Sequence, residues 1–479
     1  MSLSKTPLSN RLHIGIFGKR NSGKSSLINA ITNQEVAVVS DVPGTTTDPV
    51  YKSMEIHGIG PCVFIDTAGF DDIGDLGSMR VEKTMKVIEK TDVALVVFSA
   101  DNYISNTYNF SNTDNNVEST DNTGNTGSIE NPDEDAYNQA GFNIEEEIKW
   151  IDLLRKNKTP VIAVINKIDV FADENSKNTE TSSDSTNNMY YSANPSKFLI
   201  LNTGKINISN NIVLENLCKT IKEKTGLTPI LVSAREKIGI EKIREEIIRL
   251  LPEDYEVKSI TGNLAKENDV VLLVMPQDIQ APKGRLILPQ VQTIRDLLDK
   301  KCIVISVTTD KLDNALNSLK QPPDLIITDS QVFKTVYDKK PNESKLTSFS
   351  VLFANYKGDL KYFVESAYAI EKLNENSKVL IAEACTHAPL EEDIGRVKIP
   401  RMLRKKAGEN LKIDIVSGAD FPDDLSEYDL IIHCGGCMFN RKYVLSRVKK
   451  AQAQGIPMTN YGVTIAYLSG ILDKIDLCI

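Results

Sequence analysis

The sequence predicts an α/β protein of two or three domains. Short apolar runs alternate with helical stretches along most of the 479 residues, and this pattern is typical of parallel sheets covered by helices. A chain of this length exceeds one ordinary domain. Several apolar runs end in loops that contain Gly, Asn or Cys, and open α/β sheets build their sites at such strand ends. The chemistry of the strand ends therefore indicates the function.

Composition excludes several classes of function. A mean hydropathy of -0.23 and 41% hydrophobic residues describe a soluble globular protein. The net charge of -9 argues against a large nucleic-acid-binding face, which would be basic. No apolar run has the length of a membrane span, and the first strand begins near Leu12, so we expect a cytoplasmic protein without a signal or transit peptide. The seven cysteines then indicate metal binding or catalysis rather than disulfides.

The first domain, predicted at 1–255, opens with a strand at 12–17, a G-x-x-x-x-G-K-S loop and a helix at 26–31. In this context the loop N–H groups and the helix N-terminus cradle phosphates. We expect Lys24 to neutralise the β- and γ-phosphates and Ser25 to hold Mg²⁺. The predicted nucleotide-binding residues of this loop are Gly18, Asn21, Ser22, Gly23, Lys24, Ser25 and Ser26.

Two segments that follow predict a magnesium site for phosphoryl transfer. The loop at 44–48 reads G-T-T-T-D, in which Thr46, next to Thr45, is expected to be the second hydroxyl ligand of Mg²⁺. The next buried strand leads into D-x-x-G, in which Asp66 backs Mg²⁺ and Gly69 can turn toward the γ-phosphate.

Two later strand ends predict that the base is guanine. The first reads N-K-x-D and consists of Asn166, Lys167 and Asp169. The Asp169 carboxylate can accept two N–H bonds that adenine cannot offer, which selects GTP over ATP. The next strand ends at Ser233 and Ala234, where a backbone N–H is expected to read O6 of guanine.

The motifs G-x-x-N-x-G-K-S, G-T-T-T-D and D-T-A-G-F resemble those of the TrmE/Era branch of translation-factor-like GTPases. By this resemblance Asn21 helps to hold a K⁺ ion beside the phosphates; a plain turn residue is the alternative. Phe70 occupies the position of the water-orienting Gln of Ras-like enzymes, and a phenyl ring cannot orient water. We therefore expect a K⁺-activated GTPase. Its expected catalytic residues are Lys24, Asn21, Thr46, Asp66 and Gly69.

Two Asn-rich insertions interrupt this domain, at about 101–138 and 173–211. Both are dominated by Asn, Ser, Thr and Asp. They cannot bury enough apolar surface to order themselves, so we expect them to be disordered. Each lies between a core strand and the next helix, where an insertion costs little. We assign them no function.

The middle domain, predicted at 262–348, is α/β and carries no catalytic motif. A scaffold or oligomerisation domain is therefore the better interpretation. Its strands are expected at 270–275, 303–308, 325–328 and 350–354, and its helices at 289–300 and 310–319.

The last domain, predicted at 350–479, alternates strands and helices as a doubly wound parallel sheet does. Cys385 and His387 follow its first strand, and His433, Cys434 and Cys437 follow its third. Three thiolates and two imidazoles suit a soft metal, either a structural zinc or an iron–sulfur cluster. The strands are expected at 378–383, 412–416, 429–432 and 456–459, and the helices at 361–373, 400–408, 441–453 and 463–470.

A GTPase domain, a motif-poor middle domain and a final C-x-H…H-C-x-x-C domain together resemble the HydF family of [FeFe]-hydrogenase maturation GTPases. The phrases N-R-L-H-I-G-I-F-G, V-S-D-V-P-G-T-T-T-D-P-V-Y-K and H-C-G-G-C-M carry the likeness, which covers the chain except its insertions. The resemblance implies a [4Fe–4S] cluster on Cys385, Cys434 and Cys437, with His387, His433 or an exogenous ligand at the fourth iron.

The same resemblance implies the function and the partners. Members of the family accept a diiron precursor made by the radical-SAM enzymes HydE and HydG and pass it to apo-[FeFe]-hydrogenase, and their middle domain forms a homodimer. The alternative is a TrmE/Era-like GTPase of RNA modification or ribosome assembly with a structural zinc site. The acidic balance counts against that alternative, so we expect no nucleic-acid and no membrane partner.

Overall fold

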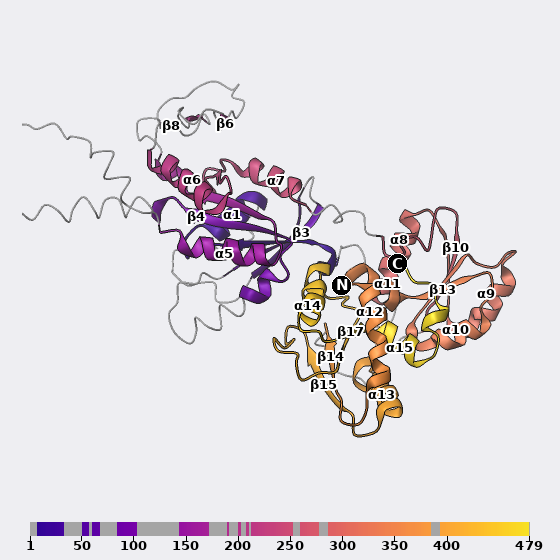
Figure 1. The fold of residues 1–479 in the computed structure, drawn as a ribbon. Helices are drawn as coiled ribbons and strands as arrows, with labels where there is room; N and C mark the ends of the chain where they lie inside the picture. Colours follow the sequence, from indigo (N-terminus) through magenta and orange to yellow (C-terminus); the bar gives the residue numbers. More distant parts are fainter. Residues whose placement is uncertain are drawn as a thin grey trace, which may run out of the picture. The chain divides into compact units, whose positions relative to one another are not determined.

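The structure, a computed structural model, is shown in Figure 1. Its residues form two compact units: Arg11–Pro252 is the first unit, and Glu253–Ile479 with Met1–Asn10 is the second. The predicted first domain is 1–255, whereas Met1–Asn10 and Glu253 onward are grouped with the second unit. No helix in the described part of the chain is long and apolar enough to cross a membrane. The structure describes residues 7–32, 50–56, 60–67, 84–102, 143–171, 189–190, 200–202, 207–209, 212–251, 259–276, 286–384 and 393–478.

The sheet of the first unit gathers the predicted nucleotide motifs at one edge. Its strands, in spatial order, are β2 (Val50–Ile56), β3 (Gly60–Asp66), β1 (Leu12–Phe17), β4 (Val93–Ser99), β5 (Val161–Asn166) and β9 (Ile230–Leu231). Only β2 is antiparallel to its neighbour in this sheet, so the loops after β1, β3 and β5 lie together. β1 and β4 are buried along their whole length, as near-continuous apolar runs require. The helices are α1 (Lys24–Thr32), α5 (Glu145–Lys156), α6 (Ile212–Thr225) and α7 (Ile240–Arg249).

The second Asn-rich insertion contains three short strands that the sequence analysis did not predict. They are β6 (Met189–Tyr190), β7 (Ile200–Asn202) and β8 (Asn207–Ser209), and they pair antiparallel. Pairing between strands that are close in the sequence has a low loop-closure cost, so it does not require a large apolar core. The prediction of disorder at 101–138 lies outside the described residues beyond residue 102.

The middle sheet of the second unit is parallel. Its strands, in spatial order, are β11 (Ile303–Val307), β10 (Val270–Val274), β12 (Leu325–Thr328) and β13 (Lys345–Ser348). The first three strands along the chain and the first two helices lie where the sequence predicts them, whereas β13 and α10 were not predicted. The helices are α8 (Leu288–Asp299), α9 (Leu312–Ser318), α10 (Phe333–Lys339) and α11 (Phe349–Lys357).

The prediction of a strand at 350–354 is wrong, because this apolar run forms helix α11. Ser348, the last residue of β13, caps the helix: its side chain accepts a hydrogen bond from the Val351 N–H. Most of the helix is buried, including Leu352 and Phe353. Its sequence therefore lacks the polar face that distinguishes an amphipathic helix from a buried strand.

The C-terminal sheet has the doubly wound arrangement that the sequence predicts, which confirms the α/β fold class. Its strands, in spatial order and all parallel, are β15 (Lys412–Ser417), β14 (Lys378–Glu383), β16 (Leu430–His433) and β17 (Met458–Asn460). The residues after β14 and β16 therefore lie at the same edge. The helices are α12 (Leu360–Ala367), α13 (Ile399–Ala407), α14 (Arg441–Ala453) and α15 (Tyr461–Leu468).

One hydrophobic core joins the middle and C-terminal sheets. It contains Leu272 and Ile326 of the middle sheet, Leu380 and Ile431 of the C-terminal sheet, and Phe363 of α12, all buried. The opposite face of each sheet has a core of its own. Because the two sheets share buried surface, we expect them to unfold together rather than as two independent domains.

The amino-terminal residues pack on the second unit. The short helix η1 (Leu8–Asn10) lies there, next to the end of α11. The buried ammonium of Lys357 donates to the backbone carbonyl of Ser9 (2.9 Å) and to the side-chain oxygen of Asn10 (2.8 Å). A buried charge needs such partners, so these bonds anchor the chain immediately before the first unit begins.

Candidate functional site

The loop after β1 closes around the side chain of Lys24, which is 8% exposed. Its ammonium donates to the carbonyl oxygens of Gly18 (2.9 Å) and Lys19 (2.8 Å). These bonds hold the ammonium inside the loop, where a P-loop binds the phosphates. Gly23 has a φ of 83°, and a Cβ there would lie 2.3 Å from the Asn166 side chain, so this position requires glycine.

Polar side chains around this loop fit a nucleotide and Mg²⁺. The Ser22 hydroxyl is fully buried and has no hydrogen-bond partner in the described structure. Ser25 Oγ donates to Asp66 Oδ2 at 2.6 Å, which brings together the hydroxyl and the carboxylate predicted to hold Mg²⁺. Burial raises the pKa of Asp66, and a bound cation would favour its ionised form.

Two further predicted residues, Asn21 and Ser26, lie at the phosphate loop and the start of α1. Asn21 is exposed and has a φ of 60°; this conformation suits a turn residue and leaves the side chain accessible to an ion. Ser26 lies in the first turn of α1. The remaining predicted residues, Thr45, Thr46, Gly69 and Phe70, lie outside the described residues.

Asn166 joins the phosphate loop to the predicted base-binding loop. Its Nδ2 donates to the Ser22 carbonyl at 3.0 Å, and its Oδ1 accepts from the Ala234 N–H at 3.1 Å. Ser233 Oγ donates to Asp169 Oδ1 at 2.7 Å, which orients the carboxylate expected to select guanine. The structure thus brings the described nucleotide residues together.

Two ion pairs beside the nucleotide site were not predicted. Lys167 Nζ lies 2.6 Å from Asp101 Oδ2, and Lys19 Nζ lies 3.3 Å from Glu147 Oε2. Glu147 is buried, and this burial raises the pKa of its carboxyl. The pairs tie both flanks of the insertion at 101–138 to nucleotide loops. The sequence could not predict these pairs, because Asp101 and Glu147 lie far from their lysine partners in the chain and belong to no motif.

The ends of β14 and β16 bring two predicted metal-binding segments together. The two strands pair, and the Cys434 N–H donates to the Ala382 carbonyl at 2.9 Å. The Cys434 sulfur accepts hydrogen bonds from the backbone N–H of Ala384 (3.0 Å) and of Gly436 (3.4 Å). Cys385 follows Ala384 directly in the chain, so it is covalently attached to a residue that contacts the Cys434 sulfur.

The predicted ligand set is only partly described. Cys437 lies in the same turn as Cys434, and both side chains are half-buried. Cys385 and His387 lie outside the described residues. The residues that the structure does describe contain no group of three side chains able to hold a metal ion.

His433 does not fit its predicted role as a candidate fourth ligand, because both ring nitrogens are engaged. Nδ1 lies 2.7 Å from the Cys434 carbonyl oxygen, and Nε2 lies 3.1 Å from Nη1 of Arg447. Arginine can only donate, so Nε2 accepts and Nδ1 carries the proton. Burial and the Arg447 charge lower the pKa of His433 to about 3. Strand geometry explains the correction, since neighbouring residues of a strand point to opposite faces.

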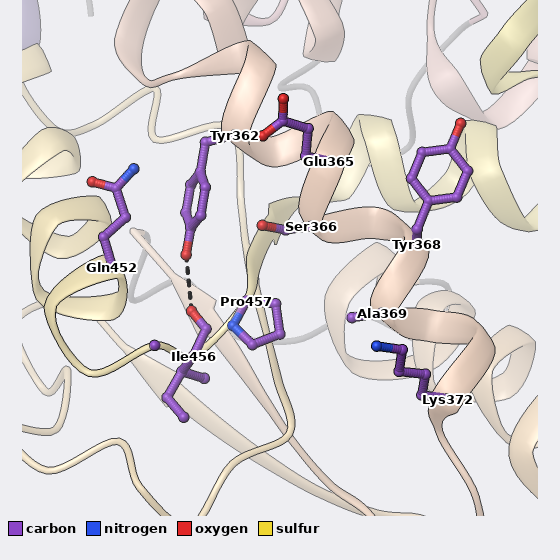
Figure 2. A pocket seen from close by; sticks show the side chains of 10 residues that line it. Tyr362, Glu365, Ser366, Tyr368, Ala369, Lys372, Gln452, Ile456 and Pro457 are labelled. Carbon is purple, nitrogen blue, oxygen red and sulfur yellow. Dashed lines mark hydrogen bonds between the residues drawn. The ribbon is translucent and has the colours of Figure 1, made fainter.

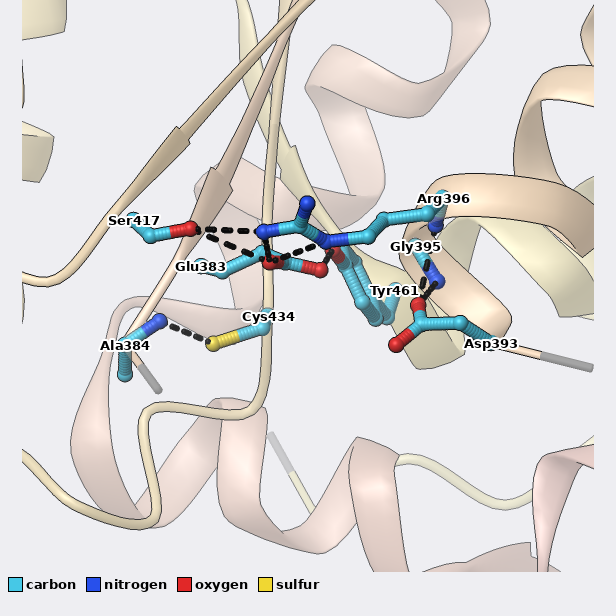
Figure 3. A network of polar contacts seen from close by, with 8 residues as sticks. All are labelled: Glu383, Ala384, Asp393, Gly395, Arg396, Ser417, Cys434 and Tyr461. Carbon is cyan, nitrogen blue, oxygen red and sulfur yellow. Dashed lines mark hydrogen bonds and ion pairs between the residues drawn. The ribbon is translucent and has the colours of Figure 1, made fainter. Parts of the chain in front are cut away.

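A buried carboxylate, Glu383, ties the flanks of the segment at 385–392 (Figure 3). Its Oε2 accepts from Nε (3.2 Å) and Nη2 (3.0 Å) of Arg396, and Tyr461 donates to Oε1 at 3.3 Å. Burial, and next the nearby Cys434, raise the pKa of Tyr461 well above its usual value. The polar network therefore lies beside the thiol site.

Comparisons with known proteins give family-model matches in both units. A model of a 50S ribosome-binding GTPase matches residues 13–130, the hydrogen maturase F dimerization domain matches 260–358, and the hydrogen maturase F tetramerization domain matches 361–476. The chain belongs to the hydrogen maturase F (HydF) family. The resemblance noted in the sequence is thereby confirmed: a GTPase-type domain is followed by the two hydrogen maturase F domains.

Individual relatives match shorter parts of the chain than the family models do together. GTPase Der of Wolinella succinogenes is 48% identical over 89 residues, which are 18% of this chain and 19% of that protein. The tRNA modification GTPase MnmE of Moorella thermoacetica is 44% identical over 91 residues, 19% of this chain and 20% of that protein. The chain thus spans about a fifth of the length of these curated relatives. Aquifex aeolicus Era bound to GDP·AlF4- is 16% identical, covers 64% of this chain and 97% of its own, and has a TM-score of 0.32.

The segment that matches the tetramerization domain also contains a pocket of about 480 Å³ (Figure 2). Residues of α12 line it, together with Gln452 of α14 and with Ile456 ahead of β17. Tyr362 donates to the Ile456 carbonyl at 2.9 Å across it. Because these residues precede β17, the pocket lies at the amino-terminal edge of the sheet, whereas Cys434 lies at the carboxyl edge. The pocket is therefore not part of the metal site.

Proposed function

We propose that this chain hydrolyses GTP and serves as a cytoplasmic scaffold for [FeFe]-hydrogenase maturation. It holds a [4Fe–4S] cluster on Cys385, Cys434 and Cys437, receives a diiron precursor from HydE and HydG, and delivers it to apo-hydrogenase. The observation that carries the proposal is the hydrogen bond from the Ala384 N–H to the Cys434 sulfur, because it joins the ends of β14 and β16. Membership of the HydF family supports the hydrogenase context.

GTP hydrolysis rests on positioning and charge. Lys24 would neutralise the β- and γ-phosphates, and Ser25 and Asp66 would hold Mg²⁺; Thr46 and Gly69 are the further residues proposed for this site. Asp169, held by the Ser233 hydroxyl, selects guanine. Asn21 holds K⁺, which supplies positive charge where the transition state needs it.

The described part of the thiol site, around Cys434 and Cys437, suits an iron–sulfur cluster. Backbone N–H groups donate to the Cys434 sulfur, and such bonds stabilise a thiolate and tune a cluster. Asn440, three residues after Cys437, caps α14, so the positive end of a helix dipole lies close to this turn in the chain. When bound through three thiolates, a cluster offers one iron with a replaceable ligand. His387 or an exogenous group is the proposed fourth ligand.

The middle sheet offers a surface for a second copy of the chain. β11 is an edge strand, and Ile303 is 56% exposed. The other edge, β13, is covered: the Leu346 N–H donates to the Asp476 carboxylate and the Asp476 N–H donates to the Leu346 carbonyl, both at 2.8 Å. An uncovered apolar edge favours pairing with another strand. We place the homodimer contact at β11, antiparallel to its copy as a two-fold axis requires.

Metal analysis of protein purified without oxygen tests the scaffold function. We expect iron and sulfide in a ratio that fits a [4Fe–4S] cluster, an EPR signal after reduction, and lower iron content in the presence of a chelator. Stoichiometric zinc without an EPR signal would instead support the alternative, a TrmE/Era-like GTPase of RNA modification or ribosome assembly with a structural zinc site.

The ion dependence of GTP turnover tests the nucleotide chemistry. We expect faster hydrolysis in KCl than in NaCl at equal ionic strength, and no such difference in Asn21→Ala. Asp169→Asn serves as the matched control: it weakens GTP binding and relaxes discrimination toward xanthosine nucleotides, but it keeps the K⁺ response. Equal rates in both salts for the unaltered protein would exclude the K⁺ role.

A further inference from the structure

A buried arginine without a carboxylate partner lies under the H-C-G-G-C turn. Arg447, on α14, is 2% exposed. Its Nη1 donates to Nε2 of His433 at 3.1 Å, its Nη2 donates to the Gly418 carbonyl, and its Nε has no hydrogen-bond partner in the described structure. Among the described residues, no Asp or Glu lies within ion-pair distance of this guanidinium. The positive charge of Arg447 is therefore buried without an anion.

Aromatic rings surround the guanidinium. Its central carbon lies 4.8 Å from the ring centroid of Phe421, 4.6 Å from that of Phe439 and 4.8 Å from that of Tyr443. Cation–π contacts favour a cation, but the rings are neutral and replace only part of the hydration that burial removes. The arrangement keeps the charge at a fixed place and leaves it uncompensated.

Arg447 is connected to the thiol turn on both sides. Before the turn it bonds His433, whose Nδ1–H donates to the carbonyl of Cys434. After the turn it stacks on Phe439, which follows Cys437 by two residues. Cys434 and Cys437 lie in the chain between these two contacts, so their thiolates are negative charges of the turn that Arg447 holds on both sides.

We infer that Arg447 is a positioning residue that fixes the H-C-G-G-C turn and compensates the negative charge of the thiolate-bound cluster. This inference rests on the proposed cluster site. A fixed cation stabilises the reduced, more negative form of a cluster and so raises its reduction potential. Hydrogen bonds to the sulfurs and their burial also affect this potential. Arg447 therefore makes the cluster easier to reduce than the thiolates alone would.

The test measures the reduction potential of the cluster in the full chain, reconstituted anaerobically with iron and sulfide and followed by EPR. Arg447→Gln removes the charge, whereas Arg447→Lys keeps a charge without the planar fork. Lys450→Met is the matched control, because Lys450 lies on the same helix but pairs with Asp423 at 2.6 Å near the surface. We expect a shift to lower potential in Arg447→Gln, a smaller shift in Arg447→Lys, and none in Lys450→Met.

An unchanged potential in Arg447→Gln at any cluster content would overturn the inference and leave the cluster site intact. If Arg447→Gln assembles no cluster, Arg447→Lys decides: a cluster in the lysine variant alone supports the charge role, and loss in both contradicts it. Absence of any cluster in the unaltered chain would overturn the proposed function, and this inference with it.

Discussion

The middle and C-terminal sheets have the same strand order, but different residues follow their strands at the carboxyl edges. In both sheets the first strand along the chain lies between the second and the third, and the fourth is at one edge. After β12 of the middle sheet, Asp329 accepts a hydrogen bond from Gln290 of α8. After β16, the equivalent strand, the chain presents Cys434 with backbone donors on its sulfur. The comparison teaches that the sheet supplies the edge, and the residues that follow each strand decide what it binds.

The largest expected effect is the loss of iron binding when a thiol at the carboxyl edge of the C-terminal sheet is removed, compared with a thiol of the middle sheet. Cys434→Ala should abolish iron binding and hydrogenase maturation, because one of three thiolates is lost. Cys302→Ala, at a buried thiol just ahead of β11, should keep both. Iron content and GTP turnover are measured on each variant, and we expect turnover to be unchanged in both. Full iron content in Cys434→Ala would show that Cys434 is not required for iron binding, and the proposed difference between the two sheets would be wrong.

A smaller effect separates the two open edge strands. Ile303→Lys places a charge on β11, and Ile415→Lys does the same on β15, where Ile415 is 37% exposed. We expect the first to raise the dimer dissociation constant at least about tenfold, or about 1.4 kcal/mol, and the second to leave it unchanged. Sedimentation at several concentrations measures this. β15 already carries Asp414 paired with Lys378 at 2.8 Å, and charges on an edge discourage pairing. If only Ile415→Lys weakened the dimer, the contact would lie on the C-terminal sheet, and the proposed contact at β11 would be wrong.

The smallest effect compares the helix caps after the fourth strands. Ser348 caps α11 and Asn460 caps α15, each by accepting a backbone N–H. Replacement of either cap by Ala should cost about 1 kcal/mol of unfolding free energy. Asn460 also donates to the Cys434 carbonyl at 3.2 Å, so its loss should cost about 1 kcal/mol more. Denaturant unfolding measures both costs, and equal values would show that the extra bond contributes nothing.

Much of the fold follows from the sequence because its signals are local. The P-loop and N-K-x-D are contiguous motifs, and the strands at 378–383 and 429–432 are short apolar runs between clear helices. The apolar run at 350–354 could not be assigned in this way, because a helix that is mostly buried has no polar face. In the candidate site, Arg447 and Glu383 were missed, since nothing in a sequence pattern pairs them with His433 and Arg396. Strand alternation could have shown that His433 and Cys434 face opposite ways.

Lys357 binds Ser9 and Asn10, so the chain begins in the second unit, passes through the first unit and returns to the second. The first unit is therefore an insertion within the second. In a chain cut at 252–258, the segment that precedes Arg11 would still be bound to Lys357 of the second unit through these two hydrogen bonds. A fragment that starts at residue 253 would lack Ser9 and Asn10, so the Lys357 ammonium would lose two acceptors while staying buried. Added back as a separate peptide, the first ten residues should bind that fragment and stabilise it.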